Sequence, residues 1–219
     1  MNKKLIESLQ TNHPDVTLVM ASKYLDKDAF GPYVDAGIKA FGESRVEALQ
    51  DKIDTFRQYP VEVHLLGTLQ TKKVKKIIND IDVLHSLDRV KLAKEINKRR
   101  ERPLRCFIQV NISNEKQKHG VEPDDLMPFL ESLKPLKNIQ PIGLMGMAEL
   151  TTDEVVIRRQ FKLLRELRDT AKNTYPSLQY LSMGMTNDYE IALEEGTTHL
   201  RLGRILLNGG MHDEKEEKA

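Results

Sequence analysis

Eight short apolar runs, rich in valine, isoleucine and leucine, recur along the chain, and each is followed by a longer stretch with helical spacing. Runs that are apolar almost throughout, rather than alternating with polar residues, are typical of a parallel sheet covered on both faces. Eight such strands alternating with helices predict an α/β protein built as a single (β/α)8 barrel of the TIM type. The runs cover residues 16–22, 38–42, 61–67, 81–87, 105–112, 139–148, 179–184 and 199–204.

An open, doubly wound sheet is the main alternative to the barrel. Such a sheet usually carries a glycine-rich turn after its first strand, whereas residues 21–28 read ASKYLDKD and contain no glycine. The length of 219 residues is near the lower end for a barrel and leaves no room for a second domain. We therefore expect a lead helix over residues 1–13, the barrel over residues 14–210 and a charged tail over residues 211–219.

Composition and charge exclude several other classes of protein. The 34 basic and 33 acidic side chains leave a net charge of +1, so no strong field attracts nucleic acid or an anionic membrane. No apolar run approaches the roughly 18 residues of a membrane span, and the start MNKKLIESLQ lacks the apolar segment of a secretory signal. The single cysteine, Cys106, lies within an apolar run, where we expect a small core residue. These features predict a cytoplasmic protein without nucleic-acid or membrane partners.

Short motifs locate two helix starts and two helix ends. The S-x-x-E motif that begins at Ser44 and the N-x-x-E motif that begins at Asn187 fit capping boxes, which would start a helix at each place. Gly37 and Gly196 lie where glycine commonly ends a helix.

In a barrel of this type the functional residues lie where the strands end. The first run ends in Ser22-Lys23, and partial desolvation at the rim would favour the neutral, nucleophilic amine of Lys23. A lysine of this kind forms Schiff bases. The alternative is an ordinary surface lysine, because the chain is rich in lysine.

The ends of the seventh and eighth runs predict a phosphate site. Ser182 and Thr186 offer hydroxyl groups on either side of Gly184, just before a helix, and Gly203-Arg204 follows the eighth run. Barrels often bind phosphate at this place with backbone amides. The alternative is that these residues only form the turn and the helix cap.

Arg201 lies inside the eighth run, where a charge is costly unless it faces a polar site. We expect the side chain to point into the barrel toward a ligand; the alternative is a buried structural salt bridge. A lysine at the rim, a phosphate cup and an inward arginine are the parts needed to hold pyridoxal 5′-phosphate (PLP).

Seven segments, in a fixed order, carry a resemblance that spans nearly the whole chain. They make the chain resemble the pyridoxal phosphate homeostasis proteins, which share their barrel with the N-terminal domain of alanine racemase. The last segment is the most specific of the seven. The segments read LVMASK, FGESRVEALQDK, HLLGTLQTKK, HSLD, QVNISNEKQKHG, GLMGMA and LSMGMTNDYEIALEEGTTHLRLGR.

The resemblance implies a role for each candidate residue. Lys23 would carry PLP as an internal aldimine, and Arg201 would face the pyridine nitrogen. Ser44, which replaces an asparagine of the family, would lie beside the cofactor. The phosphate would be bound by Ser182, by Thr186 and by the backbone around Met183, Gly203 and Arg204.

A guanidinium does not readily give up its proton, so the pyridine nitrogen facing Arg201 would stay unprotonated and the ring would be a weak electron sink. The resemblance therefore implies a PLP-binding protein of PLP homeostasis rather than an enzyme. It also implies a monomer, with PLP-dependent apoenzymes as candidate partners.

Two enzymatic functions stay open as alternatives. An amino-acid racemase needs a second base opposite Lys23, usually a tyrosine from a separate β-domain, and the sequence offers no candidate for that base. A Schiff-base aldolase would use the same lysine and phosphate cup on a sugar phosphate, without PLP. A metal site is not expected, because His64, His85 and His119 lack both His-x-His spacing and an acidic partner at ligand spacing.

Overall fold

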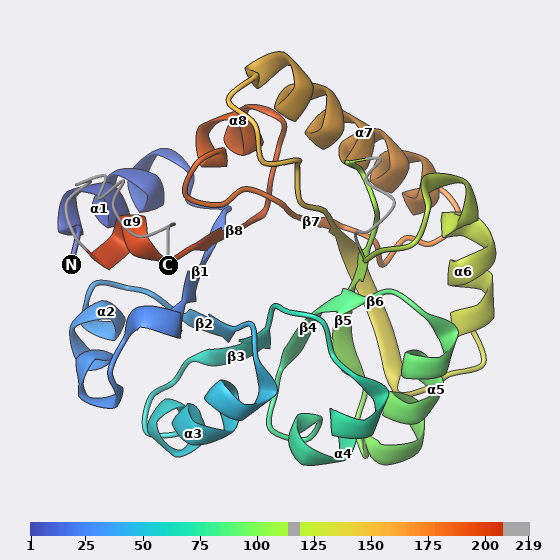
Figure 1. Cartoon of the computed structure of the whole chain (residues 1–219), viewed down its shortest axis with the longest axis horizontal. Helices are drawn as coiled ribbons and strands as arrows, with labels where there is room; N and C mark the ends of the chain where they lie inside the picture. Colours follow the sequence, from blue (N-terminus) through green and yellow to red (C-terminus); the bar gives the residue numbers. More distant parts are fainter. Residues whose placement is uncertain (114–118, 208–219) are drawn as a thin grey trace, which may run out of the picture.

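A closed barrel of parallel strands forms the centre of the molecule, and the helices surround it (Figure 1). In this computed structural model, which describes residues 1–113 and 119–207, each strand pairs with the next and β8 pairs with β1, so the ring is closed. The predicted (β/α)8 barrel is confirmed, and the doubly wound sheet is excluded. The strands are β1 Thr17–Ala21, β2 Ala40–Glu43, β3 Glu62–Leu65, β4 Val83–Leu87, β5 Leu104–Gln109, β6 Ile139–Met145, β7 Tyr180–Ser182 and β8 His199–Leu202.

Helices follow the strands around the outside of the barrel. The α-helices are α1 Lys3–Asn12, α2 Gly31–Asp35, α3 Val46–Phe56, α4 Val74–Ile77, α5 Val90–Arg99, α6 Leu126–Leu133, α7 Glu154–Lys172, α8 Tyr189–Glu194 and α9 Arg204–Leu207. Short 3-10 helices are η1 Ser22–Tyr24, η2 Lys27–Ala29, η3 Thr71–Lys73 and η4 Pro123–Asp125. No helix in the described part of the chain is long and apolar enough to cross a membrane.

The N-terminal helix α1 lies beside α9, the short helix that follows β8 (Figure 1). The Asn2 amide donates a hydrogen bond to the Leu206 carbonyl at 2.8 Å, and the Asn2 side chain donates to the Ile205 carbonyl at 3.2 Å. These bonds tie the lead helix to the segment that follows the last strand. The tail expected over residues 211–219 lies outside the described residues.

The predicted helix ends are confirmed, but both predicted capping boxes are wrong. Gly37 and Gly196 follow α2 and α8 with φ of +87° and +82°, the left-handed conformation that favours glycine. Helix α3 starts after Arg45, in extended conformation, and α8 starts after Asp188; neither residue caps its helix with a side-chain hydrogen bond. The Asp188 carboxylate instead accepts a bond from the Met185 amide at 2.6 Å, so it stabilises the loop before α8.

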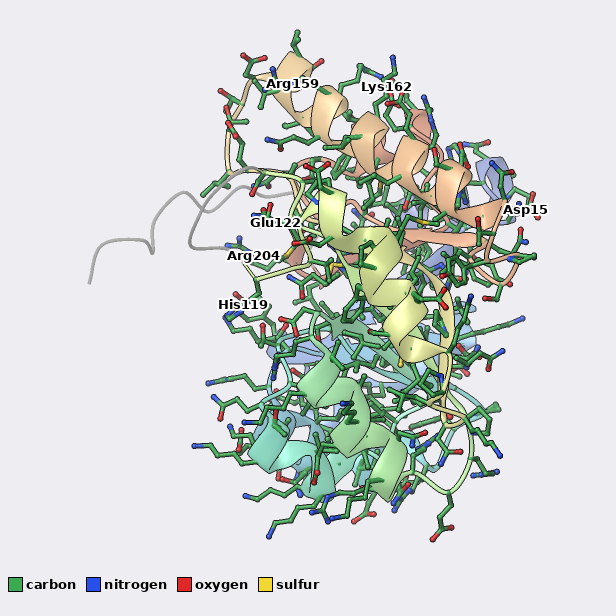
Figure 2. All side chains as sticks on the ribbon, turned by 90° about the vertical axis from the view of Figure 1, so that its right-hand side faces the viewer. Asp15, His119, Glu122, Arg159, Lys162 and Arg204 are labelled. Atoms are coloured by element: carbon green, nitrogen blue, oxygen red, sulfur yellow. The ribbon has the colours of Figure 1, made fainter. Side chains whose placement is uncertain are left out.

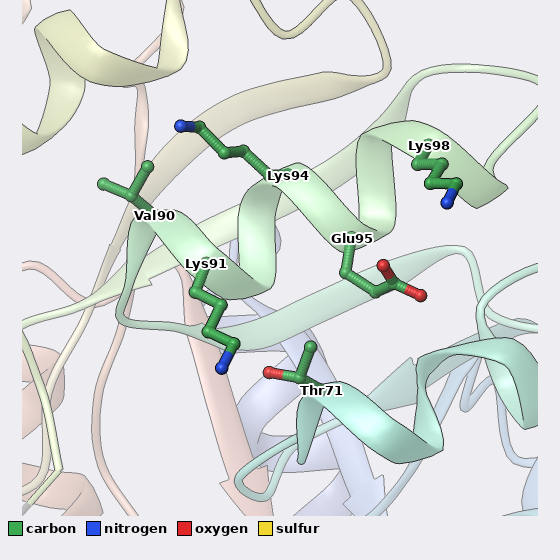
Figure 3. A pocket seen from close by; sticks show the side chains of 6 residues that line it. All are labelled: Thr71, Val90, Lys91, Lys94, Glu95 and Lys98. Atoms are coloured by element: carbon green, nitrogen blue, oxygen red, sulfur yellow. The ribbon is translucent and has the colours of Figure 1, made fainter.

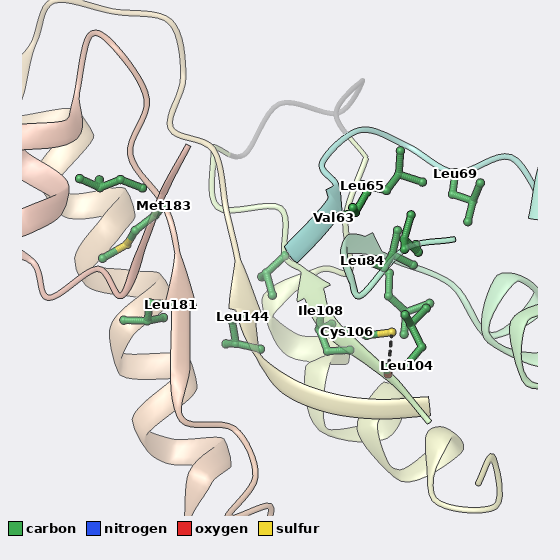
Figure 4. Close-up of a cluster of buried hydrophobic side chains, with 14 of the residues drawn as sticks. Val63, Leu65, Leu69, Leu84, Leu104, Cys106, Ile108, Leu144, Leu181 and Met183 are labelled. Carbon is green, nitrogen blue, oxygen red and sulfur yellow. Dashed lines mark hydrogen bonds between the residues drawn. The ribbon is translucent and has the colours of Figure 1, made fainter. Parts of the chain in front are cut away.

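The two faces of the strands differ in character. Side chains that point outward pack against the helices in one large apolar core, part of which Figure 4 shows around Cys106, Ile108, Leu144 and Leu181. Cys106 is fully buried there, and burial raises the pKa of its thiol, so it is the core residue that the sequence predicted.

Polar side chains occupy much of the barrel interior, where TIM barrels usually carry branched apolar residues. His64, His85 and His199 are buried, and so is Arg201. A small apolar cluster of Val83, Phe107, Ile142 and Met145 packs separately from the main core, and the His85 and Phe107 rings lie 4.6 Å apart. The interior is therefore built around a polar network.

Gly143 allows β6 and β7 to approach each other, and Gly143→Ala is expected to lower the free energy of unfolding by about 1–3 kcal/mol. A Cβ atom at this position would lie 2.1 Å from the Tyr180 carbonyl oxygen and 3.0 Å from the Phe107 ring. Urea denaturation measures the loss. Gly31→Ala is the control, because its Cβ would meet only the Tyr59 hydroxyl at 3.4 Å. Equal losses in the two variants would contradict the steric explanation.

Candidate functional site

The carboxyl ends of the strands form one mouth of the barrel. Figure 2 shows Arg204, which follows β8, on the same side as His119 and Glu122, which follow β5, whereas Asp15, which precedes β1, lies on the opposite side. Every candidate site residue lies at the carboxyl end of its strand or just beyond it. The mouth is thus the place where a barrel of this type carries its function.

Lys23 lies in η1, directly after β1, and its side chain is exposed. Its Nζ atom is 3.3 Å from the Tyr24 hydroxyl and 4.9 Å from the centre of the Tyr24 ring. The partial desolvation expected of this lysine is therefore not found. The amine stands at the rim, open to an incoming ligand.

A buried ion pair supports the segment that carries Lys23. The Lys52 ammonium of α3 donates to the Glu43 carboxylate of β2 at 2.6 Å and also to the Ser22 backbone carbonyl. The Ser22 hydroxyl donates to the same carboxylate at 2.9 Å. Both charged side chains are at least 90% buried, with exposed fractions of 10% for Lys52 and 2% for Glu43. Sequence reasoning missed this pair, which fixes the residue next to Lys23.

Arg201 points into the barrel and is buried. Its guanidinium donates to the Ser182 hydroxyl at 2.6 Å and to the Gly146 carbonyl at 3.1 Å. No carboxylate among the described residues lies within 4.0 Å of it, so the structural salt bridge weighed above is absent from this part of the chain. Burial lowers the pKa of Arg201 to about 10, although the negative charge of Asp188 acts in the opposite direction.

The loop after β7 and the start of α9 contain amide groups that have no partner within residues 1–113 and 119–207. The N–H groups of Thr186, Gly203 and Arg204 donate no hydrogen bond to any described residue. Gly184 has a φ of +93°, and a Cβ there would lie 2.6 Å from the Ala192 Cβ, so only glycine fits this turn. Unpaired amides at two neighbouring strand ends are suited to bind an anion.

The other candidates lie nearby, with different exposures. Ser182 is fully buried, and its hydroxyl contacts Arg201 and the Nδ1 atom of His85. The Met183 side chain packs in the main core, as Figure 4 shows, which leaves only its backbone for the mouth. Ser44 follows β2 and is exposed.

Packing brings the separate strand ends together. A Cβ built on Gly203 would lie 3.5 Å from the Ala21 Cβ, so the end of β8 adjoins the segment of Lys23. A Cβ built on Gly67 would lie 2.1 Å from the Ser44 carbonyl oxygen, so the loop after β3 presses against the end of β2. The structure therefore collects the lysine, the arginine and the unpaired amides at one mouth.

A surface cavity lies away from these residues. It has a volume of about 500 Å³ and lies between η3 and α5, lined by Thr71, Val90, Lys91, Lys94, Glu95 and Lys98 (Figure 3). None of the candidate site residues lines it. No group of three or more His, Cys, Asp or Glu side chains among the described residues is placed to hold a metal ion.

Comparison with known families agrees with the fold. Residues 30–209 match the family described as "Alanine racemase, N-terminal domain". The structure thus defines a parallel barrel of the alanine racemase N-terminal-domain class.

Curated relatives identify the family to which the chain belongs. The chain is 37% identical to the pyridoxal phosphate homeostasis protein of Aquifex aeolicus, over 86% of this chain and 85% of the relative. It is 31% identical to the protein of the same name from Escherichia coli, over 92% and 88% of the two chains. The chain belongs to the pyridoxal phosphate homeostasis protein family.

Solved structures give the same relationship. PipY of Synechococcus elongatus matches with a TM-score of 0.88 without PLP and 0.85 with PLP bound, at 30% and 29% identity, over 95% of this chain and 100% of PipY. Alanine racemase of Clostridium difficile matches with a TM-score of 0.74 at 13% identity. The chain covers 57% of that racemase, and the likeness concerns the fold alone.

Proposed function

We infer that this protein binds PLP and serves in PLP homeostasis. The observation that carries this inference is the Arg201 guanidinium, which is buried at the mouth of the barrel without a described carboxylate partner. A buried charge of this kind is costly unless a ligand completes its contacts. Curated relatives named as homeostasis proteins and PipY with PLP bound support PLP as that ligand.

Each part of PLP has a counterpart at the mouth. When bound, PLP supplies an aldehyde that condenses with an amine and a ring that withdraws electrons. We assign the amine to Lys23, which is exposed at the rim. We assign the phosphate to the unpaired amides of Thr186, Gly203 and Arg204, with the Met183 backbone and Ser44 lining the same mouth.

Arg201 would limit how strongly the ring of bound PLP withdraws electrons. With a pKa of about 10 the guanidinium keeps its proton at neutral pH, so it would donate a hydrogen bond to the ring nitrogen of bound PLP and would leave that nitrogen unprotonated. An unprotonated ring is a weak electron sink. This supports a protein that holds PLP and releases it to apoenzymes, rather than one that turns over amino acids.

The racemase alternative lacks support from the arrangement around Lys23. A racemase needs two bases on opposite faces of one carbon atom. The Tyr24 hydroxyl lies 3.3 Å from Lys23 Nζ, so these two groups contact each other instead of facing each other across a gap. We further propose that the protein acts as a monomer.

Titration of the purified protein with PLP tests the proposed function. We expect saturation at one PLP per chain, a visible absorption band that survives gel filtration, and loss of that band after borohydride treatment. Peptide mapping should then locate the trapped group on Lys23. A protein that stays colourless at saturating PLP would contradict the proposed function. Sustained change in the chirality of L-alanine would instead favour the racemase.

Arg201→Met is expected to weaken PLP binding by about 10- to 100-fold, because a hydrogen bond from a charged donor is lost. The free energy of unfolding is not expected to fall, because the substitution removes a buried charge that has no described carboxylate partner. Equilibrium titration and urea denaturation measure the two quantities. Arg100→Met is the control: Arg100 also donates to backbone carbonyls but lies after α5. A destabilised Arg201→Met protein with unchanged PLP affinity would contradict the assignment.

A further inference from the structure

A continuous series of hydrogen-bonding side chains crosses the barrel interior and ends at Arg201. From Glu62 Oε2 the contacts lead to His64 Nε2 at 3.2 Å, and from His64 Nδ1 to His85 Nε2 at 2.9 Å. His85 Nδ1 lies 2.8 Å from Ser182 Oγ, which accepts the bond from Arg201 at 2.6 Å. Glu62 begins β3, at the end of the barrel opposite the mouth, whereas Arg201 is near the end of β8, so the series runs through the interior toward the mouth. We call these five residues the interior chain.

The two ends of the interior chain fix the direction of every bond in it. An ionised carboxylate only accepts hydrogen bonds and a guanidinium only donates them. Glu62 therefore accepts from His64 Nε2–H, which leaves His64 Nδ1 to accept from His85 Nε2–H. His85 Nδ1 must then accept from the Ser182 hydroxyl. The reverse direction would place a bare imidazole nitrogen against the carboxylate, so a single tautomer satisfies all the contacts.

Burial agrees with this pattern of protonation. His64 and His85 are fully buried, and burial lowers the pKa of both imidazoles, so both are neutral at neutral pH. The hydrogen bond from His64 and the nearby Arg105 guanidinium lower the pKa of Glu62 to about 2. The interior chain thus has a negative charge at one end, a positive charge at the other and two neutral rings between them.

The Ser182 hydroxyl links His85 to Arg201. Its only hydroxyl proton is donated to His85, so toward Arg201 it acts as an acceptor. We propose that Glu62, His64 and His85 are positioning residues for the cofactor-binding guanidinium, acting through Ser182. This proposal rests on the PLP-binding function proposed above. It reassigns Ser182, which the sequence predicted as a phosphate ligand, to the anchoring of Arg201.

The tautomers can be measured without any cofactor. In the ligand-free protein labelled with 15N-histidine, two-bond proton–nitrogen correlations distinguish Nε2–H from Nδ1–H imidazoles. We expect His64 and His85 to be neutral Nε2–H tautomers at neutral pH. An Nδ1–H tautomer at either residue, or a charged imidazolium, would overturn the proposal.

Three substitutions of His85 test the action on the cofactor. The Asn amide oxygen of His85→Asn can take the place of Nδ1 and accept from Ser182. The Gln amide nitrogen of His85→Gln can take the place of Nε2 and donate to His64, but the acceptor for Ser182 is lost. His85→Leu lacks both groups. We expect PLP affinity and the visible absorption band to stay near wild type in His85→Asn, with about 10-fold weaker binding and a shifted band in the other two.

His199→Leu is the matched control, because this buried imidazole lies 6.3 Å from the His85 ring and bonds to Thr198 instead of the interior chain. It removes the same ring volume and should leave the band unchanged. If affinity and band follow only the loss of stability in all four variants, the role is structural and the proposal fails. The wrong tautomer in a protein that binds PLP normally would refute this inference alone, whereas a wild-type protein that binds no PLP would refute the proposed function and this role with it.

Discussion

Lys23→Ala is expected to abolish the covalent retention of PLP, the largest functional effect that the structure predicts. After treatment with PLP and borohydride, intact-mass measurement should show one added pyridoxyl group on the wild-type chain and none on the variant. The fold should be unaffected, because the Lys23 side chain is exposed and, among the described residues, its polar contacts are with Tyr24. We expect the free energy of unfolding to change by less than about 0.5 kcal/mol.

Lys27→Ala is the matched control for this experiment. Lys27 lies four residues further along in η2, is exposed, and pairs with Asp51 at 2.8 Å. It should be labelled like wild type. Some non-covalent PLP binding should persist in Lys23→Ala, since Arg201 and the unpaired amides of the mouth remain. A pyridoxyl group recovered on Lys23→Ala, or one lost in Lys27→Ala, would show that another amine reacts.

The fold was predictable because the strand signal is local. A run of five to ten mainly apolar residues marks each strand, and the eight observed strands lie within the predicted runs except at Glu43 and Leu104, one residue beyond. Helix starts were less predictable. The motif at Ser44 fits a capping box, but β2 extends to Glu43 and Arg45 is still extended. Helix α3 therefore begins one residue too late for Ser44 to cap it.

The candidate site was only partly predictable from the sequence. Lys23 is visible as a charge at the end of the first apolar run and Arg201 as a charge inside the eighth, and both lie at the mouth. The contacts between Ser182, His85 and Arg201 join three strands. The three side chains lie at the same level along the barrel axis only because neighbouring strands of a closed barrel are staggered. A linear sequence does not contain that stagger.

One missed feature did leave a signal. Lys52 lies on the buried stripe of α3, between Leu49 and Ile53, where a lysine needs a partner. Glu43 directly follows the second apolar run and is the acid at the end of the neighbouring strand. A search for unpaired charges on apolar stripes would have found this ion pair.

Lys52→Met is expected to lower the free energy of unfolding by about 3–5 kcal/mol, the largest effect on stability that the structure predicts. Methionine fills the volume of the lysine stem but leaves the Glu43 carboxylate buried with the Ser22 hydroxyl as its remaining partner in the described part of the chain. Lys73→Met is the control, because Lys73 pairs with Glu47 at 2.8 Å on the surface. That loss should stay below about 1 kcal/mol.

The double variant Lys52→Met/Glu43→Leu distinguishes two contributions to the free energy of unfolding: the penalty of burying Glu43 without Lys52, and the net contribution of the intact ion pair. Replacing both partners of a buried ion pair by apolar residues is often neutral, so the double variant should be more stable than Lys52→Met alone. We expect PLP binding to be weaker than wild type in both the single and the double variant, because the Ser22 carbonyl has lost the donor that fixes the residue beside Lys23. Urea denaturation and PLP titration on the same samples distinguish these effects. Recovery of stability together with full PLP affinity would mean that the pair supports the barrel and not the site, whereas recovery of stability alone would identify it as the support of the reactive lysine.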